Sequence, residues 1–409
     1  MSLKVVHINT SHKGGAGIAT LRLHNALHKA NIKSAFLSKG LSIDFKNETV
    51  DDTFFEYKQP TLVRRIINKI APGKTTSFIK KFNKIKSDID CEIVSLPISN
   101  YKLHNHPFVL EADIVNLHWV GDLIDYPTFF KNVSKPIVWT MHDMNPFKGI
   151  FHYETDAYKN SNFAATEEKM FSLKRKHLLC IDKGACLSPS KWLLDEAAKT
   201  NMFSSFKIQN VIPNSIEINS PEHHIQKEKS RKLLGLNNDD HVLLFISGSL
   251  DIERKGFVFL QEALEDMKSS LTLLTVGHGE VSIKNNNITL KPLGFLSDTS
   301  KIAEAYNAAD AVVLPSIEDN LPNTMLEALS YARPVISFKV GGIQEHIKEP
   351  MNGVLAKTIS SQSLKQAIED FINKKERFDP EKIITYAKHH FSFQNQASKY
   401  IELYKQLQN

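Results

Sequence analysis

The chain has 409 residues, of which 42% are hydrophobic and 23% are charged. At roughly 100–200 residues per domain, this length predicts two domains, and the composition excludes a wholly disordered protein. No stretch approaches the about 18 apolar residues that span a bilayer, and Met1–Asn9 lacks the apolar region and cleavage site of a signal peptide. We therefore expect a cytoplasmic protein.

The cysteines and the net charge exclude further kinds of site and partner. Cys91, Cys180 and Cys186 have no paired spacing and no neighbouring set of histidine ligands, so neither a disulfide framework nor a zinc site is indicated. The net charge of +6 is modest, and no zinc finger, RNA-recognition signature or helix-turn-helix spacing occurs, which argues against nucleic acid as a partner.

The first half alternates short apolar runs with longer amphipathic segments, as in the units of a parallel sheet. We predict a strand at Lys4–Asn9, a turn with Gly14, Gly15 and Gly17, and a helix at Ile18–Ala30. Further strands are predicted at Ala35–Ser38, Ala112–Leu117 and Pro136–Thr140. Residues 1–214 then form one doubly wound domain of Rossmann type.

An insertion at about residues 58–86 interrupts this alternation. It carries nine basic residues and no acidic one: Lys58, Arg64, Arg65, Lys69, Lys74, Lys80, Lys81, Lys84 and Lys86. Apolar residues interleave with them as in a pair of basic amphipathic helices split at Pro72-Gly73. A membrane-surface role and a helical hairpin packed on its own domain are both open from the charge pattern.

The second half repeats the architecture after a polar linker at residues 215–235. A second Rossmann-like domain is predicted at 236–390, with strands at His241–Ser247, Leu271–Val276, Ile288–Lys291, Ala311–Leu314 and Pro334–Phe338. Residues 391–409 form a final helix, with apolar residues at helical spacing over Asn395–Leu407, which could cap either domain.

The first candidate site is the turn with Gly14, Gly15 and Gly17 between a strand and a helix. Glycines at this place allow backbone amides to approach an anion at the positive end of the helix, and they equally suit a tight structural turn. The spacing is not G-x-G-x-x-G and no acidic residue follows at ribose distance, so a nicotinamide site is disfavoured.

The second candidate site lies after the first strand of the second domain. Gly248 ends this strand, and Arg254-Lys255-Gly256 opens the next helix. An arginine and a lysine beside helix amides suit a diphosphate, although a surface pair of this kind is usually only solvated.

The third candidate site is the segment 315–329, which follows the strand Ala311–Leu314. Asp319, Asn320 and Leu321 lie in a turn, Asn323 is placed to cap the next helix, and Thr324 falls in its first turn. Glu327 lies one turn into the helix, where an acid alone would be unremarkable. The combination is what indicates a site.

Together these residues resemble the retaining glycosyltransferases called family 4. Asp319 and Glu327 match the E-x7-E signature, with Asp in place of the first Glu, and Gly248-Ser249 with Lys255-Gly256 matches the Gly-Arg and Lys-Gly segment, with Ser249 in place of Arg. Further matches, in order, are Leu117-His118-Trp119, Thr140-Met141-His142-Asp143-Met144, Ser188-Pro189-Ser190-Lys191-Trp192, Ile212-Pro213-Asn214-Ser215, Val276-Gly277-His278-Gly279, Ala308-Ala309-Asp310 and Gly341-Gly342-Ile343-Gln344-Glu345.

The resemblance implies the GT-B fold, an α/β architecture in which two doubly wound parallel-sheet domains face an interdomain cleft. It also implies roles: Glu327 binds the donor's ribose, Asp319 contacts the transferred sugar, and Arg254 and Lys255 neutralise the diphosphate. His118 and His142 lie near the reacting sugar, and the turn at Gly14 lies near the donor phosphates. Gly248, Gly277, Asn320, Leu321, Asn323 and Thr324 complete the predicted donor contacts.

The expected activity is therefore a retaining transfer from a nucleoside-diphosphate sugar to a glycan or polyprenyl-linked acceptor in cell-surface polysaccharide synthesis. No cofactor and no metal are expected, because fixed cations and helix amides stabilise the leaving phosphate. Two alternatives remain: a nucleotide-sugar epimerase of the same fold, and an inactive nucleotide-sugar-binding protein, which the Asp319 and Ser249 departures suggest.

Overall fold

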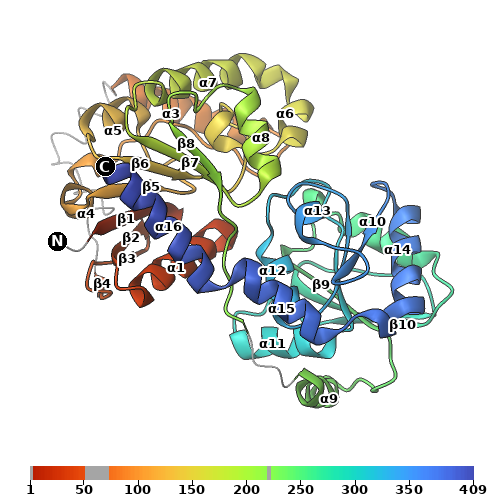
Figure 1. The fold of residues 1–409 in the computed structure, drawn as a ribbon. Helices are drawn as coiled ribbons and strands as arrows, with labels where there is room; N and C mark the ends of the chain where they lie inside the picture. The colour runs from red at the N-terminus through yellow and green to blue at the C-terminus, as the bar shows by residue number, and fades with distance from the viewer. Residues whose placement is uncertain (1–2, 51–72, 219–222) are drawn as a thin grey trace. The chain divides into compact units, whose positions relative to one another are not determined.

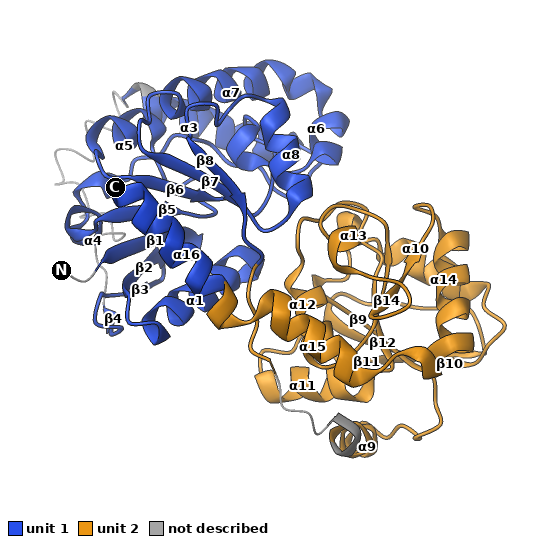
Figure 2. Cartoon of the chain, viewed as in Figure 1, with its two compact units in different colours: residues 1–213, 396–409 blue, residues 214–395 orange. Residues whose placement is uncertain are grey.

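A computed structural model describes residues 3–50, 73–218 and 223–409 of the chain. The chain divides into two compact units (Figure 2). The first unit comprises Met1–Pro213 together with Gln396–Asn409, and the second comprises Asn214–Asn395. All but the first three residues of the final helix (Phe393–Gln408) therefore belong to the first unit. None of the helices in the described ranges combines the length and the apolar character that a bilayer crossing requires.

The first unit is built on an eight-stranded sheet with the order β4-β3-β2-β1-β5-β6-β7-β8. All neighbours pair in parallel except β3 with β2 and with β4. The chain runs outward from β1 in both directions, so the switch point lies between β1 and β5, where such sheets place ligands. The strands are β1 (Lys4–Ser11), β2 (Lys33–Lys39), β3 (Leu41–Ile43), β4 (Thr49–Val50), β5 (Ile114–Leu117), β6 (Ile137–Thr140), β7 (Gly184–Ser188) and β8 (Ile208–Val211).

Helices cover both faces of this sheet (Figure 1). One face carries α1 (Gly14–Lys29) and α16 (Phe393–Gln408). Val6, Leu117 and Trp139 on the other face pack into a core shared with four helices. These helices are α4 (Pro107–Glu111), α5 (Tyr126–Asn132), α7 (Ala164–Leu178) and α8 (Lys191–Lys199).

The start of α1 corrects one expectation. The helix begins at Gly14 and not at Ile18, so the glycines predicted to form a turn lie in its first turn. Gly17 is required there, because a Cβ atom at this position would lie 2.4 Å from the carbonyl oxygen of Ser11.

The second unit is a six-stranded, wholly parallel sheet with the order β11-β10-β9-β12-β13-β14. The five strands predicted from apolar runs are all present. They are β9 (Val242–Ser249), β10 (Leu271–His278), β11 (Ile288–Pro292), β12 (Ala311–Leu314) and β13 (Val335–Phe338), and the sheet adds β14 (Gly353–Ala356). Within the segment predicted as a linker lies the helix α9 (His223–Leu233).

The two faces of this sheet bury separate cores, which makes the unit a three-layer sandwich. One core joins Leu244, Val312 and Val335 to α11 (Thr299–Ala308), α12 (Asn323–Ser330) and α15 (Pro380–Phe391). The other joins Leu243 and Val313 to α10 (Phe257–Glu265) and α14 (Ser361–Lys374). Strands buried on both faces account for the continuous apolar runs that the sequence shows.

The described half of the basic insertion forms the helix α3 (Lys74–Ile85). Its apolar residues Phe78, Ile79 and Phe82 pack on a core of the first unit that includes Ile150 and Phe151. Lys80, Lys81, Lys84 and Lys86 are exposed. The apolar face is therefore covered by its own domain while the basic face meets solvent; the first predicted helix, with Lys58, Arg64, Arg65 and Lys69, lies outside the described residues.

Candidate functional site

In the second unit, the predicted basic pair and the first predicted acid meet at the carboxyl ends of β9 and β12. The sequence had suggested that Arg254 and Lys255 open the helix α10. They lie instead in a separate short 3-10 helix, η5 (Glu253–Lys255), which precedes α10. The Lys255 Nζ atom lies 2.6 Å from Asp319 Oδ2, and Arg254 Nη1 lies 3.3 Å from the same oxygen. The structure thus joins residues 64 positions apart into one charge cluster.

The three side chains of this cluster are largely buried, and their burial affects the pKa of Asp319. The side chains of Arg254 and Asp319 are 8% and 12% exposed, and that of Lys255 is 24% exposed. Burial by itself raises the pKa of Asp319, but Lys255 and Arg254 outweigh it and hold the pKa below its usual range. Arg254 Nη1 also donates to the Glu318 carbonyl oxygen at 2.9 Å. The cluster therefore carries two cations and one ionised carboxylate.

Gly256 explains how the two loops approach so closely. Its φ angle is +69°, and a Cβ atom there would lie 1.8 Å from the Pro315 carbonyl oxygen. The amide of Ile317 donates to the Arg254 carbonyl oxygen at 2.9 Å, so the loops are also bonded through their backbones. Only glycine satisfies both the backbone conformation and the contact.

Glu327, the second predicted acid, lies on α12 and is half-buried. The hydroxyl of Tyr306, a fully buried residue of α11, donates to Glu327 Oε2 at 2.8 Å. The Tyr306 ring stacks on Tyr331, with centroids 5.1 Å apart. Tyr306 therefore anchors the carboxylate predicted to bind ribose.

The start of α12 differs from the expectation. The helix begins at Asn323, so the N-cap position is occupied by Pro322 and not by Asn323. Asn320 is buried, and its carbonyl oxygen accepts a hydrogen bond from the Gly342 amide at 2.8 Å. Leu321 packs in the core and Thr324 is half-buried in the first turn.

Gly248 and Gly277 lie near the ends of the neighbouring strands β9 and β10. Gly277 has a φ angle of +149°, and a Cβ atom there would lie 2.5 Å from the Ser247 carbonyl oxygen. Gly248 is exposed and has nothing within 4 Å of the corresponding position. Gly277 is thus required by the fold, whereas Gly248 leaves the end of β9 open to solvent.

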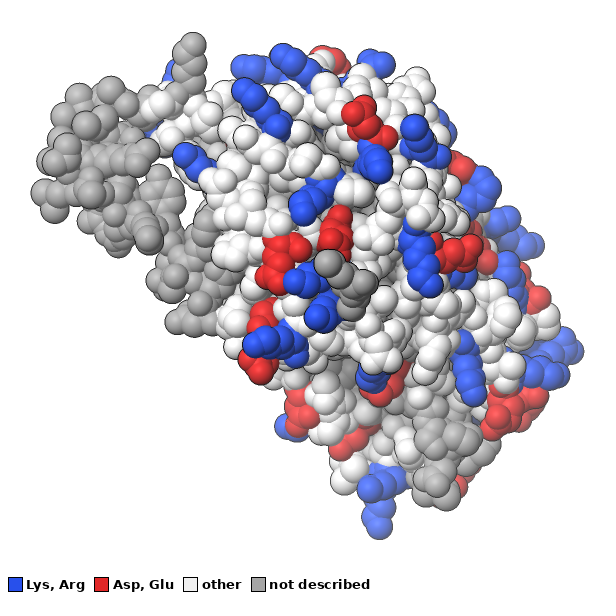
Figure 3. Space-filling model, turned by 60° about the vertical axis from the view of Figure 1, so that its left-hand side comes forward, with Lys and Arg blue, Asp and Glu red and all other residues white. Residues whose placement is uncertain are grey.

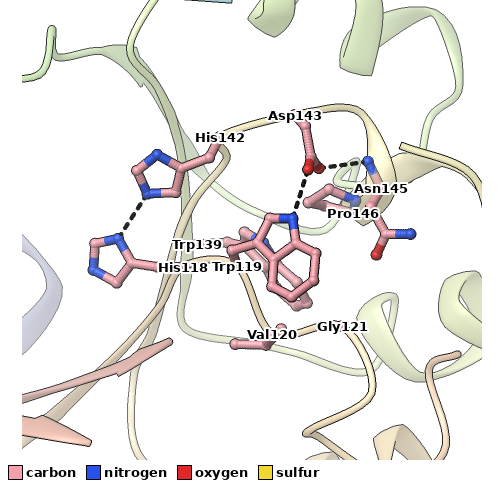
Figure 4. A pocket seen from close by; sticks show the side chains of 9 residues that line it. All are labelled: His118, Trp119, Val120, Gly121, Trp139, His142, Asp143, Asn145 and Pro146. Atoms are coloured by element: carbon pink, nitrogen blue, oxygen red, sulfur yellow. Dashed lines mark hydrogen bonds between the residues drawn. The ribbon is translucent and has the colours of Figure 1, made fainter. Parts of the chain in front are cut away.

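In the first unit, the predicted histidines follow the ends of β5 and β6, and His118 Nδ1 lies 3.1 Å from His142 Nε2 (Figure 4). His118 is buried and His142 is half-buried. A third histidine, His7 of β1, places its Nδ1 atom 3.0 Å from His118 Nε2. Burial lowers the pKa of His142 to about 4, and burial with the neighbouring histidines lowers the pKa of His118 well below its usual range. The imidazoles are therefore neutral at pH 7.

Beside these histidines, the first unit has a small pocket whose lining includes both of them, Trp119 and Asp143 (Figure 4). Asp143 Oδ2 accepts hydrogen bonds from Trp119 Nε1 at 2.7 Å and from His152 Nδ1 at 2.6 Å. Burial by itself raises the pKa of Asp143, but His152 and the other donors hold it below its usual range. The pocket thus combines neutral imidazoles, a fixed indole ring and an ionised carboxylate.

The remaining predicted residues of the first unit, Gly14 and Gly15, are exposed at the start of α1. No side chain caps this helix and no acid lies in its first turn, so its positive end is not neutralised locally. The glycines and the histidines both lie at the edge where the parallel strands end.

Sequence reasoning missed several residues of these sites. His7 and Tyr306 belong to elements read from their apolar periodicity, and His152 lies in a bend before α6, outside any predicted strand or helix. Asp143 stood inside a quoted motif but was not selected. A polar residue inside a strand predicted to be buried was a usable signal for His7.

The fold and the sites define an α/β protein of the GT-B type, and the comparisons agree. Residues 240–374 match the family model described as glycosyl transferases group 1. The matched residues lie within the second unit.

A candidate glycosyltransferase of teichuronic acid biosynthesis, TuaC of Bacillus subtilis (strain 168), is 29% identical over 240 residues, covering 57% of this chain and 54% of TuaC. A glycogen synthase of Thermodesulfovibrio yellowstonii (strain ATCC 51303 / DSM 11347 / YP87) is 29% identical over 194 residues, covering 44% of this chain and 38% of that protein. The chain thus spans about half the length of these relatives, or less.

Solved structures extend the similarity in fold to nearly the whole chain. The sucrose-phosphate synthase tll1590 of Thermosynechococcus elongatus has a TM-score of 0.66 at 16% identity, with 99% of each chain covered. Alr3699/HepE of Anabaena, solved in complex with UDP-glucose, has a TM-score of 0.62 at 17% identity, covering 99% of this chain and 100% of that one.

Proposed function

We propose that this protein is a retaining glycosyltransferase of the family 4 type, which transfers a sugar from a nucleoside-diphosphate sugar to a glycan or polyprenyl-linked acceptor in cell-surface polysaccharide synthesis. The observation that carries the proposal is the cluster of Arg254, Lys255 and Asp319 on the same sheet edge as the Glu327 helix. The complex of Alr3699/HepE with UDP-glucose gives a precedent for the donor class in this fold.

The second unit has the chemistry that donor cleavage requires. When the bond between the sugar and the diphosphate breaks, negative charge grows on the leaving oxygen and positive charge on the anomeric carbon. Lys255, the most exposed member of the cluster, can bind the phosphates as a compact cation, while Arg254 is fixed by its bond to Glu318. Asp319 contacts the transferred sugar, and Glu327 accepts hydrogen bonds from ribose hydroxyls. The two fixed cations supply the charge that a metal would otherwise provide.

The first unit supplies the acceptor side in this proposal. Neutral His142, half-buried and held by buried His118, can form a hydrogen bond with a sugar hydroxyl without introducing charge, and the half-buried Trp119 ring offers an apolar surface of the kind on which sugar rings stack. The polar lining of the pocket supports an acceptor that carries hydroxyl groups.

We also propose a peripheral contact with anionic membrane through α3. Its apolar residues are packed on the first unit, so this contact would depend on charge, from the exposed lysines at positions 80, 81, 84 and 86. On the face shown in Figure 3, Lys and Arg lie interspersed with Asp and Glu.

The first test is a thermal-shift panel of nucleoside diphosphates and their sugars, followed by a transfer assay with the best donor. A ligand at 100 times its Kd stabilises the folded protein by about 2.7 kcal/mol. Substituting Lys255→Met should abolish the shift, whereas Lys365→Met should preserve it, because Lys365 pairs with Asp266 away from the cluster.

The transfer assay separates the alternatives. Product with an unchanged anomeric configuration, formed in the presence of EDTA, supports the proposal in full. Conversion of the donor without any acceptor indicates an epimerase, and binding without conversion across a wide acceptor screen indicates an inactive binding protein. No shift with any nucleotide would overturn the donor site.

A further inference from the structure

The sheet of the first unit has polar side chains on a face that is fully buried. His7, Asn116 and Thr140, on the neighbouring strands β1, β5 and β6, are at most 3% exposed. Parallel strands buried on both faces are ordinarily apolar, and a buried polar group is costly unless it is hydrogen-bonded. The placement of these three groups is therefore specific and calls for partners.

The last helix supplies partners for Asn116 and Thr140. Tyr400 and Tyr404 lie one turn apart on α16, and both are fully buried. The Tyr404 hydroxyl donates to Asn116 Oδ1 at 3.0 Å, and the Tyr400 hydroxyl lies 3.0 Å from Thr140 Oγ1. Burial raises the pKa of both phenols, so they remain protonated and able to donate.

The bond from Tyr404 to Oδ1 and the Leu117 carbonyl oxygen beside Nδ2 together set which end of the Asn116 amide faces the histidines. With Oδ1 held by the phenol, Nδ2 lies 2.8 Å from His118 Nε2 and 3.1 Å from Thr140 Oγ1. Nδ2 also lies 3.5 Å from the Leu117 carbonyl oxygen, a place where an amide oxygen would be repelled. Because Nδ2 can only donate, His118 Nε2 must accept.

The proton positions of the histidines follow from this. A neutral imidazole that accepts at Nε2 carries its proton on Nδ1, so His118 donates from Nδ1 to His142 Nε2 at 3.1 Å. His142 then also carries its proton on Nδ1. His7 Nδ1, 3.0 Å from His118 Nε2, is consistent with a second donor to the same atom.

We propose that Tyr404 is a positioning residue: through Asn116 it fixes the tautomers of His118 and His142, so that the imidazole beside the pocket is a hydrogen-bond donor at Nδ1. The hydroxyl that does this lies 288 positions from the amide it orients. Its consequence for acceptor binding rests on the proposed function, whereas the tautomer assignment does not.

The test uses the full chain with 15N-labelled histidine and long-range 1H–15N correlation spectra of the imidazoles at pH 7, with His118 assigned by a His118→Gln variant. The wild-type protein should show His118 protonated on Nδ1. In Tyr404→Phe the amide is free to rotate and present its oxygen, so a population protonated on Nε2 should appear. Tyr400→Phe is the matched control, because its hydroxyl contacts Thr140 and not the amide, and it should leave the tautomer unchanged.

A second variant tests the same inference if Tyr404→Phe does not fold. Asn116→Asp offers His118 only acceptor oxygens and should force the proton onto Nε2. In the transfer assay, Tyr404→Phe should raise the acceptor KM by about tenfold, the value of one hydrogen bond, with the donor KM unchanged. A wild-type His118 protonated on Nε2, or an Nδ1 tautomer retained fully in both variants, would overturn the inference, whatever the activity of the protein.

Discussion

Replacing Asp319 with asparagine should destabilise the second unit. The carboxylate accepts from Lys255 Nζ at 2.6 Å and lies 3.3 Å from Arg254 Nη1, and none of the three side chains is more than 24% exposed. Asp319→Asn leaves two neighbouring cations without their counterion, and removing one partner of a buried pair costs about 3–5 kcal/mol. Because Arg254 keeps its bond to the Glu318 carbonyl oxygen, we expect a loss near the lower end, about 3 kcal/mol.

The stability difference between the wild type and Asp319→Asn should depend on pH. The folded pKa of Asp319 lies below the value of about 3.9 for an unfolded aspartate, so its contribution is present above that pH and is lost as the pH falls through the folded pKa. The wild type and Asp319→Asn should therefore differ most near neutral pH and converge below about pH 4.

Urea unfolding at pH 7 can assign the loss to one unit. The three tryptophans, Trp119, Trp139 and Trp192, all lie in the first unit, so their fluorescence follows that unit alone, while far-UV circular dichroism follows both. Hydrogen exchange of β9 and β12 should show the loss directly.

The matched control is Asp266→Asn, the same substitution in the same unit at an exposed aspartate paired with Lys365, which should leave the unfolding midpoint unchanged. Equal stability of Asp319→Asn and wild type, or equal losses in the two variants, would refute the reasoning.

Three further predictions follow from single contacts. Gly256→Ala should lower the stability of the second unit by several kcal/mol, because its Cβ atom would meet the Pro315 carbonyl oxygen and its φ angle is positive. Gly248→Ala has open space around it and should leave the stability unchanged in the same hydrogen-exchange measurement. Unchanged stability of Gly256→Ala would contradict the contact. Burial lowers the pKa of Lys174 to about 7, so above that pH the unfolded state binds more protons than the folded state, and the stability of the first unit should rise from pH 7 to 10. Urea titrations followed by tryptophan fluorescence should show that this rise vanishes in Lys174→Met. The rise should persist in Lys176→Met, because Lys176 is an exposed residue of the same helix. Charge reversal of the exposed lysines at and just after α3 (Lys80, Lys81, Lys84 and Lys86) should weaken sedimentation with anionic liposomes several-fold. Charge reversal of four exposed lysines of the second unit (Lys268, Lys284, Lys301 and Lys374) should not weaken it. Equal liposome binding by the two variants would dismiss the membrane proposal.

The strand β12 was predicted because its burial on both faces produces an uninterrupted apolar run. The prediction for β12 matches the structure from Ala311 to Leu314. The strand β8 was missed because Gln209 and Asn210 are exposed at the edge of its sheet, where the apolar signal is absent. The start of α1 was placed four residues late because glycine disfavours helix, whereas the close approach of Gly17 to Ser11 requires it there.

The sites show a different limit. Local motifs located Arg254, Lys255, Asp319 and Glu327, but not the ion pairs that join the first three, because pairing across 64 positions depends on how the loops after β9 and β12 meet. The residues that support the predicted ones were missed for the same reason. Tyr306 and Tyr404 have the apolar spacing of ordinary core residues, and only the position of their hydroxyls distinguishes them.

The two sites also differ in how they should respond to pH, which gives a last prediction. His142 has a pKa of about 4 because of burial, and burial with the neighbouring histidines holds the pKa of His118 well below its usual range, so neither imidazole changes its charge between pH 5.5 and 8.5. If these histidines hold acceptor hydroxyls as neutral partners, kcat/KM for the acceptor should show no inflection near pH 6.5 that His142→Gln removes. A protonation step that disappears in this variant, measured with saturating donor, would mean that His142 titrates as a solvent-exposed imidazole does, and that the buried network does not keep it neutral.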